Sequence, residues 1–259
     1  MIRETLSVVI ITKDEEANIR ECLEGVKWAD EIVIVDDMSL DRTVTICREY
    51  TDKIFFRKMD GFGAQKQYGI DKATGDWVLS LDADERLSPE LENRINGILE
   101  AGSHYAGYRI RRKTFYLGVW IRHCGWYNSA IRLFRRGGGR SDMRYVHESI
   151  VVSGNVGEIM SPMSHYSYKS IDQHVKKLSV YTDHEARGLY EKGIRISGAR
   201  IIWLCGLKPF AAFIRKYLFM SGFLDGIRGL IISFFTAFAV FLNYAKVWQI
   251  QKNTGPKDP

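Results

Sequence analysis

The chain has 259 residues, of which 46% are hydrophobic and 26% are charged, so it is a globular protein long enough for one large domain with a peripheral element. Its formal net charge is +6, and residues 109–144 hold ten Lys and Arg against a single acid, Asp142. Such a cluster is typical of a solvated face or of a surface that attracts anionic acceptors and lipid headgroups. No helix-turn-helix, zinc-finger or RNP pattern accompanies the basic residues, which argues against nucleic acid as a partner.

Four cysteines are scattered along the chain without zinc-like or redox spacing, so we expect reduced thiols in a cytoplasmic protein. The sequence runs from Met1 almost directly into an apolar strand, and we therefore expect no signal peptide.

Short apolar runs alternate with helical stretches in the first third of the chain. We expect strands at residues 6–11, 31–35, 53–56 and 77–81, and helices at residues 15–26, 42–50 and 63–73. This alternation predicts an α/β domain with a mostly parallel central sheet and helices on both faces. Ligands bind such sheets at the carboxyl ends of the strands.

The middle of the chain has a different pattern, with further strands expected at residues 108–117, 130–135 and 149–152. From Ile171 onward the chain is expected to be helical, beginning with a helix over residues 172–189.

The C-terminal region is rich in Phe, Leu and Ile between Gly206 and Ala245. Its residues 229–245 carry no charge and are flanked by Arg228 and Lys246, a length at the lower limit for a membrane-spanning helix. We favour an amphipathic helical tail that lies in the membrane interface, with residues of about 206–246 as the associating segment. A spanning helix or hairpin and a soluble dimerisation helix are the alternatives.

Acidic residues follow three of the expected strands. Asp82 and Asp84 come after residues 77–81, Asp36 and Asp37 after residues 31–35, and Glu15 shortly after the first strand. Two carboxylates separated by one residue can bind one Mg²⁺ or Mn²⁺, and Mg²⁺ held in this way usually completes its shell with water and substrate phosphates. The pattern therefore indicates a nucleotide diphosphate site, with a solvated acidic loop as the alternative.

Together, residues 9–18, 35–41 and 81–85 resemble family 2 glycosyltransferases with the GT-A fold, which bind nucleotide-diphospho-sugars. The segments Val146-His147-Glu148 and His165-Tyr166-Ser167-Tyr168 and the basic apolar tail resemble the bacterial lipopolysaccharide inner-core β-glucosyltransferases. The resemblance implies a GT-A catalytic domain over residues 1–170, with a nucleotide-binding half (1–100) and an acceptor half (101–170). A helical region over residues 171–259 follows it.

The resemblance also assigns the donor site. Thr12 and Asp37 would hold a uracil base, with Asp36 as the alternative contact or as a helix cap. Glu15 would contact the nucleotide or act as a first-turn helix acid. Lys66 would bind phosphate or sugar, unless it is a solvated lysine.

The metal residues implied by the resemblance are Asp82, Asp84 and His165. Asp84 is the more direct ligand, whereas Asp82 would act partly through ribose or water. His165 would contribute a neutral imidazole, with a structural role as the alternative.

The catalytic base implied by the resemblance is Glu148, with His147 as the second candidate. On the acceptor side, Trp126 would stack on a sugar ring or pack in a core. Lys177 would approach the diphosphate or the acceptor.

These features predict an inverting, metal-dependent hexosyltransferase that moves a sugar from a UDP-sugar, with UDP-glucose as one candidate, to a lipid-linked or lipopolysaccharide core acceptor. We expect it on the cytoplasmic side of the inner membrane, peripheral or with a spanning segment, and a homodimer is one possible state. Another cell-envelope acceptor or a polyprenyl phosphate is the alternative within the class. A non-catalytic membrane-surface binding protein on a GT-A fold is the alternative outside it.

Overall fold

The computed structural model describes residues 3–142, 149–198 and 200–254. These residues form two compact units. The first contains Met1–Lys113 and Asn128–Tyr166, and the second contains Thr114–Tyr127 and Ser167–Pro259. The second unit therefore combines a short segment from the middle of the chain with the C-terminal helices, and each unit is described by itself below.

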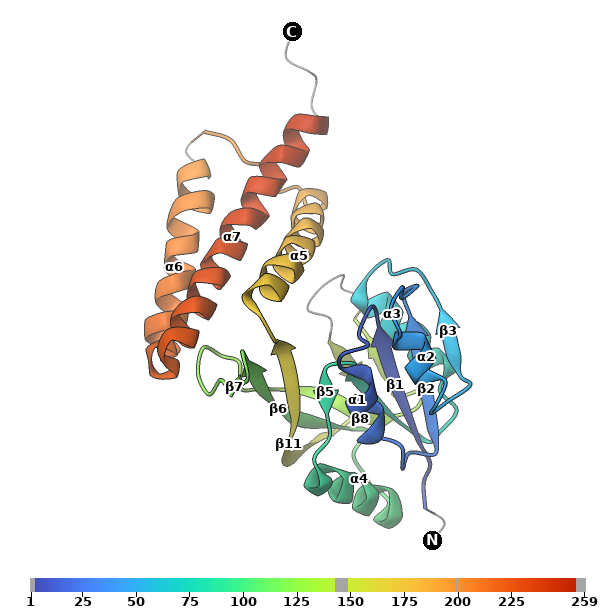
Figure 1. Ribbon diagram of the computed structural model, residues 1–259. Helices are drawn as coiled ribbons and strands as arrows, with labels where there is room; N and C mark the ends of the chain where they lie inside the picture. The colour runs from blue at the N-terminus through green and yellow to red at the C-terminus, as the bar shows by residue number, and fades with distance from the viewer. Residues whose placement is uncertain (1–2, 143–148, 199, 255–259) are drawn as a thin grey trace. The chain divides into compact units, whose positions relative to one another are not determined.

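The first unit is built on a mixed sheet with the order β3-β2-β1-β4-β8-β6-β11-β5 (Figure 1). Its parallel half consists of β1 (Leu6–Thr12), β2 (Glu31–Asp36), β3 (Ile54–Phe56) and β4 (Trp77–Asp82). These are the four strands expected from the apolar runs, so the α/β class is confirmed.

The other half of the sheet is antiparallel, which corrects the expectation of a mostly parallel sheet. It contains β5 (Glu85–Arg86), β6 (Gly107–Tyr116), β8 (Asn128–Arg135) and β11 (Val156–Tyr168). β8 pairs antiparallel with both β4 and β6, and β11 pairs antiparallel with β5. Antiparallel neighbours need no crossover helix between them, and the chain between β6 and β8 contains none.

The strand β11 was not expected from the sequence. Of its thirteen residues, only Ile159 and Met163 have little exposed surface. The strand therefore lacks the regular alternation of apolar and polar residues from which strands are recognised.

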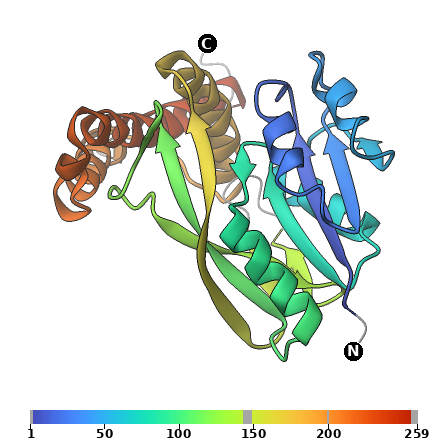
Figure 2. The ribbon, with the colours of Figure 1, turned by 60° about the horizontal axis from the view of Figure 1, so that its bottom comes forward.

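Helices cover both faces of the parallel half of the sheet (Figure 2). On one face, α1 (Ile19–Glu24), α2 (Thr43–Cys47) and α4 (Pro89–Ala101) pack in the same core cluster as Val8 and Ile10 of β1. On the other face, α3 (Phe62–Lys72) packs in a cluster with Val9. Successive strand residues point to opposite faces, so β1 contributes to both layers. The helices α1 and α2 are shorter than expected.

Helix α3 lies very close to the sheet because Gly69 faces it. A Cβ atom at this position would lie 2.5 Å from Cγ1 of Val9 and 3.0 Å from Cγ2 of Val35. Any larger residue would push α3 outward, and with it Lys66, which is one turn earlier on the same helix.

A small two-stranded sheet completes the first unit. It is formed by β9 (Gly139–Ser141) and β10 (Ile150–Val152), and the backbone N–H of Ser141 donates to Oε1 of Gln67 on α3.

The second unit is mostly helical. It contains β7 (Val119–Trp120), α5 (Ile171–Glu191), α6 (Lys208–Ile214) and α7 (Gly226–Thr254). Two π-helical turns, Ile202–Leu207 and Arg215–Phe219, extend α6 at both ends, and a short 3₁₀ turn over Gly222–Asp225 leads into α7. Within this unit α7 packs against both α5 and α6. The expected helix over residues 172–189 corresponds to α5.

Candidate active site

The carboxyl ends of three parallel strands are adjacent. In the sheet register Thr12 of β1 lies beside Asp36 of β2, and Ile11 lies beside Asp82 of β4. The three acidic segments predicted from the sequence are therefore brought to one edge of the sheet, which is where α/β sheets bind their ligands.

Asp82 is held between two cations. Its Oδ1 lies 2.7 Å from Nζ of Lys66, and its Oδ2 lies 3.0 Å from Nη2 of Arg132 on β8. Burial by itself would raise the pKa of the Asp82 carboxyl, but the charges of Lys66 and Arg132 outweigh this effect and hold the pKa well below its usual range. Asp82 is therefore ionised at neutral pH.

Lys66 is 3% exposed, so the alternative of a solvated lysine is wrong. A buried ammonium group needs a charged partner, and Asp82 supplies one. The predicted contact with phosphate or sugar stays a prediction.

Arg132 and Glu85 extend this ion-pair network, and the sequence analysis did not assign either of them to the site. Nη2 of Arg132 lies 2.6 Å from Oε1 of Glu85, which has no exposed surface, and Nη1 of Arg112 lies 3.7 Å from the same oxygen. The signal for Arg132 was its place in the apolar run 130–134, where a charged residue in a buried strand requires a partner.

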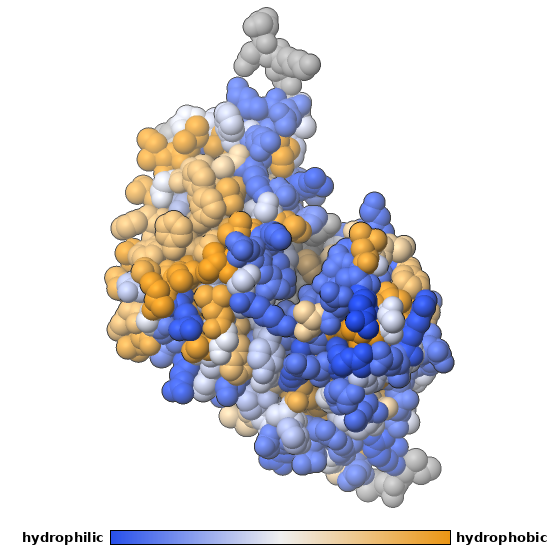
Figure 3. Space-filling view, viewed as in Figure 1, coloured by the Kyte–Doolittle hydropathy of each residue, from blue (hydrophilic) through white to orange (hydrophobic). Residues whose placement is uncertain are grey.

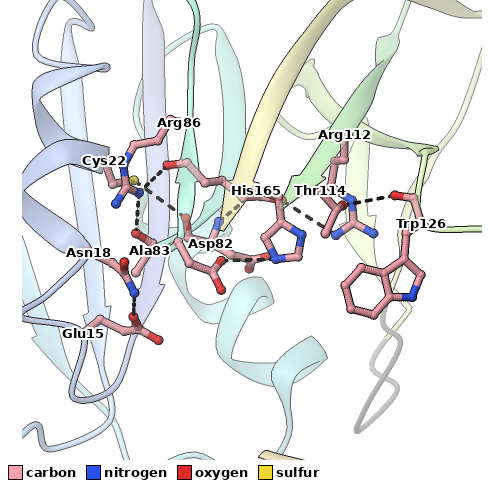
Figure 4. Close-up of polar contacts among 12 residues, drawn as sticks. Glu15, Asn18, Cys22, Asp82, Ala83, Arg86, Arg112, Thr114, Trp126 and His165 are labelled. Atoms are coloured by element: carbon pink, nitrogen blue, oxygen red, sulfur yellow. Dashed lines mark hydrogen bonds and ion pairs between the residues drawn. The ribbon is translucent and has the colours of Figure 1, made fainter. Parts of the chain in front are cut away.

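The loop that carries the acidic pair is fixed by local hydrogen bonds (Figure 4). The backbone N–H of Asp82 donates to Oε2 of Glu85 over 3.0 Å, and Nη1 of Arg86 donates to the carbonyl of Ala83 over 3.0 Å. The Cys22 thiol lies 3.7 Å from the carbonyl oxygen of Asp82. These contacts hold the backbone around Asp82 and Asp84 in place.

Asp84 lies opposite His165. Nε2 of His165 is 3.5 Å from Oδ1 of Asp84, because β5 and β11 pair with His165 beside Glu85. The backbone N–H of Tyr166 also donates to the carbonyl of Asp84. Asp84 and His165 are thus two of the predicted metal residues that the fold does bring together, whereas Asp82 is engaged by Lys66 and Arg132.

This donor set suits a divalent cation that also binds substrate. Among the residues that the structure describes, no group of three or more His, Cys, Asp and Glu side chains could hold a metal ion. Mg²⁺ is commonly bound by one or two carboxylates, and waters and substrate phosphates complete its shell. One carboxylate and one imidazole are consistent with this kind of site.

Asp36 and Asp37 have different surroundings, although they are neighbours in sequence. Asp36 is fully buried, and its carboxylate accepts hydrogen bonds from the backbone N–H and the hydroxyl of Ser39 at 2.7 and 2.5 Å. Asp37 is partly exposed, and its Oδ1 accepts from the backbone N–H of Met59 at 2.8 Å. The side chain of Asp36 thus closes a turn, and Asp37 is the better placed of the two for a ligand.

Thr12 supports the position of Asp37, because its carbonyl accepts the backbone N–H of Asp37 over 2.9 Å. Its own hydroxyl is buried and has no hydrogen-bond partner among the described residues. Glu15 accepts a hydrogen bond from Nδ2 of Asn18, the N-cap residue of α1. Because α1 begins at Ile19 and its first-turn acid is Glu21, the alternative of Glu15 as a first-turn helix acid is wrong.

Four predicted residues cannot be compared with this site. Glu148 and His147 lie outside the described residues. Trp126 and Lys177 belong to the second unit. There Trp126 packs edge-on against Tyr116 with ring centroids 5.5 Å apart, and Nζ of Lys177 lies 5.8 Å from the ring centroid of Tyr168. Their acceptor roles stay predictions.

Comparison with known proteins identifies relatives along nearly the whole chain. A family model described as glycosyl transferase family 2 matches residues 7–171. The lipopolysaccharide core biosynthesis glycosyltransferase LpsC of Rhizobium meliloti is 30% identical over 255 residues, which cover 93% of this chain and 93% of LpsC. An uncharacterized glycosyltransferase of Rickettsia typhi is 33% identical over 262 residues, covering 95% of this chain and 87% of that protein.

Among solved structures, Staphylococcus aureus TarS in complex with UDP-GlcNAc superposes with a TM-score of 0.49 and 14% identity, covering 98% of this chain and 93% of that one. The family match spans more than half of the chain and includes the strand-end residues Thr12, Asp37, Asp82 and Asp84. The protein has a mixed α/β fold, is a glycosyltransferase and belongs to glycosyl transferase family 2.

Proposed function

We propose that the protein is an inverting, metal-dependent glycosyltransferase that transfers a sugar from a UDP-sugar to a lipid-linked or lipopolysaccharide core acceptor. We place it at the cytoplasmic side of the inner membrane. Family membership supports the reaction class, and the match to LpsC, which is named for lipopolysaccharide core biosynthesis, supports the acceptor class. A polyprenyl phosphate or another cell-envelope acceptor is the alternative that the experiment below distinguishes.

The observation that carries the proposal is the 3.5 Å approach of His165 to Asp84 beside the ionised Asp82. Asp84 and His165 would hold Mg²⁺ or Mn²⁺, and the bound cation would stabilise the charge that develops on the departing diphosphate. Lys66 and Arg132 add two buried positive charges at the end of β4, where fixed charges favour a developing anion most strongly.

Asp37 is the proposed contact for the uracil base, because its carboxylate is partly exposed at the end of β2. A carboxylate accepts the uracil N3–H, and the hydrogen bond selects uracil over bases that present an acceptor at that position. Thr12 lies between Asp37 and the acidic loop in the sheet and would line the same nucleotide site.

In the proposed reaction the acceptor hydroxyl oxygen forms a bond to the anomeric carbon of the donor sugar. The bond from that carbon to the diphosphate oxygen breaks, and its electron pair leaves with UDP. The hydroxyl proton passes to a base on the acceptor side, for which Glu148 is the first candidate and His147 the second. A single displacement of this kind inverts the anomeric configuration.

The test combines a donor panel with an acceptor panel. UDP-sugars and GDP-mannose are supplied with Mn²⁺, with lipopolysaccharide core and polyprenyl phosphate as acceptors, and the anomeric configuration of the product is determined. We expect turnover with a UDP-sugar and inversion. Turnover only with GDP-mannose, or a product that retains the donor configuration, would contradict the proposed donor or mechanism. The acceptor that is consumed decides between the two acceptor classes.

The base is tested with matched variants. Glu148→Gln is expected to keep UDP-sugar binding and to lose turnover, because it removes only the proton acceptor. If Glu148→Gln stays active and His147→Ala is inactive, the base is His147.

A further inference from the structure

The second unit presents an unusually apolar surface along its last two helices. Figure 3 shows hydrophobic residues gathered over α6 and α7. On α7, exposed large side chains recur every three or four residues, so they form one stripe. The stripe contains Ile227, Leu230, Phe234, Phe238 and Phe241. On α6 and its flanking turns, Trp203, Leu207, Phe210, Leu218 and Phe219 are exposed, the last of them by 81%.

The opposite face of α7 is the one that packs within the unit. Gly229, Ile232, Ser233, Tyr244 and Val247 are buried, and Ile232 and Val247 belong to two core clusters. The exposed stripe is therefore additional to the apolar surface that the fold requires. Exposed patches of this extent are typical of sites that bind a protein or a membrane.

The charges of this segment indicate a lipid surface. Residues 200–254 contain seven Lys and Arg and a single acid, Asp225, which accepts hydrogen bonds from the backbone N–H groups of Arg122 and His123. Two of the cations are used inside the unit, since Lys208 donates to the Tyr244 hydroxyl and Lys216 to the carbonyl of Cys124.

A third cation, Lys246, pairs with Asp183 of α5 at 2.8 Å. The other four, Arg200, Arg215, Arg228 and Lys252, are at least partly exposed and lie toward the ends of the two helices. Exposed cations beside an apolar face match the anionic headgroups and acyl chains of a bilayer.

The packing of α5 against α7 favours an α7 helix that lies on the membrane over one that spans it. By length and composition α7, with the turn before it, is long and apolar enough to cross a bilayer over Gly222–Thr254. However, α5 runs along α7 and exposes charged residues at Asp172, Lys176, Asp183, Arg187 and Glu191. A spanning α7 with α5 attached would bring these charges into hydrocarbon, which is strongly unfavourable.

We propose that the α6–α7 hairpin lies in the plane of an anionic bilayer with its exposed stripe among the acyl chains and α5 on the aqueous side. This inference deepens the membrane placement of the proposed function and rests on it. It specifies which face meets the lipid and excludes a spanning arrangement of α7. A second copy of the chain on the same stripe is the competing occupant.

The first experiment is flotation of the full chain with vesicles of phosphatidylethanolamine and phosphatidylglycerol. The double variant Phe234→Ser and Phe238→Ser is expected to bind these vesicles at least about tenfold more weakly, because two aromatic side chains leave the acyl region. Met160→Ser is the matched control, since Met160 is an exposed apolar residue of the first unit, and it is expected to bind normally.

Charge is tested with Arg215→Gln and with vesicles of phosphatidylcholine alone, both of which are expected to weaken binding. Unchanged flotation of the double variant would overturn the inference. A dimer in light scattering that the double variant dissociates, without flotation of the parent chain, would assign the stripe to a second copy. UDP binding by the same variants separates this result from the proposed transfer reaction, because UDP binding is expected to be retained.

The second experiment measures how deep labelled residues of α7 lie in the bilayer. Cys22, Cys47 and Cys124 are buried, so a Cys205→Ser background allows a nitroxide label at a cysteine introduced in place of Ile227, Phe234 or Phe241. A helix in the membrane plane places the three labels at equal, shallow depth. A spanning helix places Phe234 deeper than Ile227, and that gradient would overturn the in-plane arrangement.

Discussion

Nζ of Lys66 lies 2.7 Å from Oδ1 of Asp82, and this ion pair joins helix α3 to the end of strand β4. The lysine is almost fully buried, and Asp82 also contacts Arg132. With Glu85 and Arg112 included, three cations of this network face the two carboxylates of Asp82 and Glu85, which leaves one excess positive charge next to the Asp84–His165 pair. A binding site for a diphosphate needs this balance of charge.

Lys66→Met is expected to weaken UDP binding by about tenfold or more, because one charge-assisted contact is worth about 1.5–3 kcal/mol. Titration calorimetry with UDP measures the change. Lys72→Met is the matched control, since Lys72 lies on the same helix but is exposed, and it should bind UDP normally. Equal losses in both variants would show that the effect is a general change of charge.

Arg132→Met is expected to destabilise the fold by about 3–5 kcal/mol, because Glu85 would stay buried with a weaker partner, Arg112, at 3.7 Å. Urea unfolding measures the change. Arg111→Met should cost about 1 kcal/mol or less, because the Arg111–Glu158 pair is exposed to solvent. A loss at Arg132 no larger than that at Arg111 would mean that the buried network contributes little stability.

Asp37→Ala is expected to weaken UDP binding by about 1–3 kcal/mol while leaving stability nearly unchanged. Asp36→Ala is expected to lower the free energy of unfolding by about 1–3 kcal/mol, because the buried carboxylate of Asp36 holds the turn at Ser39. Its effect on UDP binding is expected to be the smaller of the two. Calorimetry and thermal unfolding on both variants give the two readouts. Full UDP affinity in Asp37→Ala would move the base contact to another residue.

Asp84→Ala is expected to reduce transfer by at least about a hundredfold while the circular dichroism spectrum stays the same, because the developing charge on the diphosphate would lose its cation. Mn²⁺ affinity should fall in parallel. The control Asp71→Ala changes an exposed acid on α3 that accepts a hydrogen bond from Gln67, and it should keep its activity. Full activity of Asp84→Ala would remove this residue from the metal site.

Stability is expected to fall in acid because of His174 in the second unit. Burial lowers the pKa of His174 from 6.5 to about 4, and its ring stacks on Tyr168 and lies near the hydroxyl of Tyr116. Between these two pH values the unfolded chain binds a proton that the folded protein does not, so stability present above pH 6.5 is lost as the pH falls towards 4.

Because each pKa unit corresponds to about 1.36 kcal/mol, lowering the pKa of His174 from 6.5 to about 4 limits the loss of stability to about 3 kcal/mol. Urea unfolding of the full chain at several pH values measures the slope, and His174→Phe should flatten it. A slope that survives this substitution would assign the acid sensitivity to other groups.

The strand ends could be predicted from the sequence because they depend on local pattern. The apolar runs of β1, β2 and β4 are followed directly by Thr12, Asp36 and Asp82, and parallel strands place such residues at one edge. Family membership followed from the resemblance carried by residues 9–18, 35–41 and 81–85. The α/β class and helix α5 also followed from the sequence. These properties are set by periodicity and by residues that are close together in the chain.

The partners of those residues were decided only by the tertiary structure. Arg132 meets Asp82 across 50 positions because β8 pairs antiparallel with β4, and His165 meets Asp84 because a strand without clear alternation, β11, pairs with β5. Likewise, residues 229–245 favoured a surface helix and left a spanning helix as an alternative, and our proposal separates the two by the packing of the charged helix α5 along α7. Such contacts depend on strand register and helix packing, which residues distant in the chain determine together, so no local pattern in the sequence encodes them.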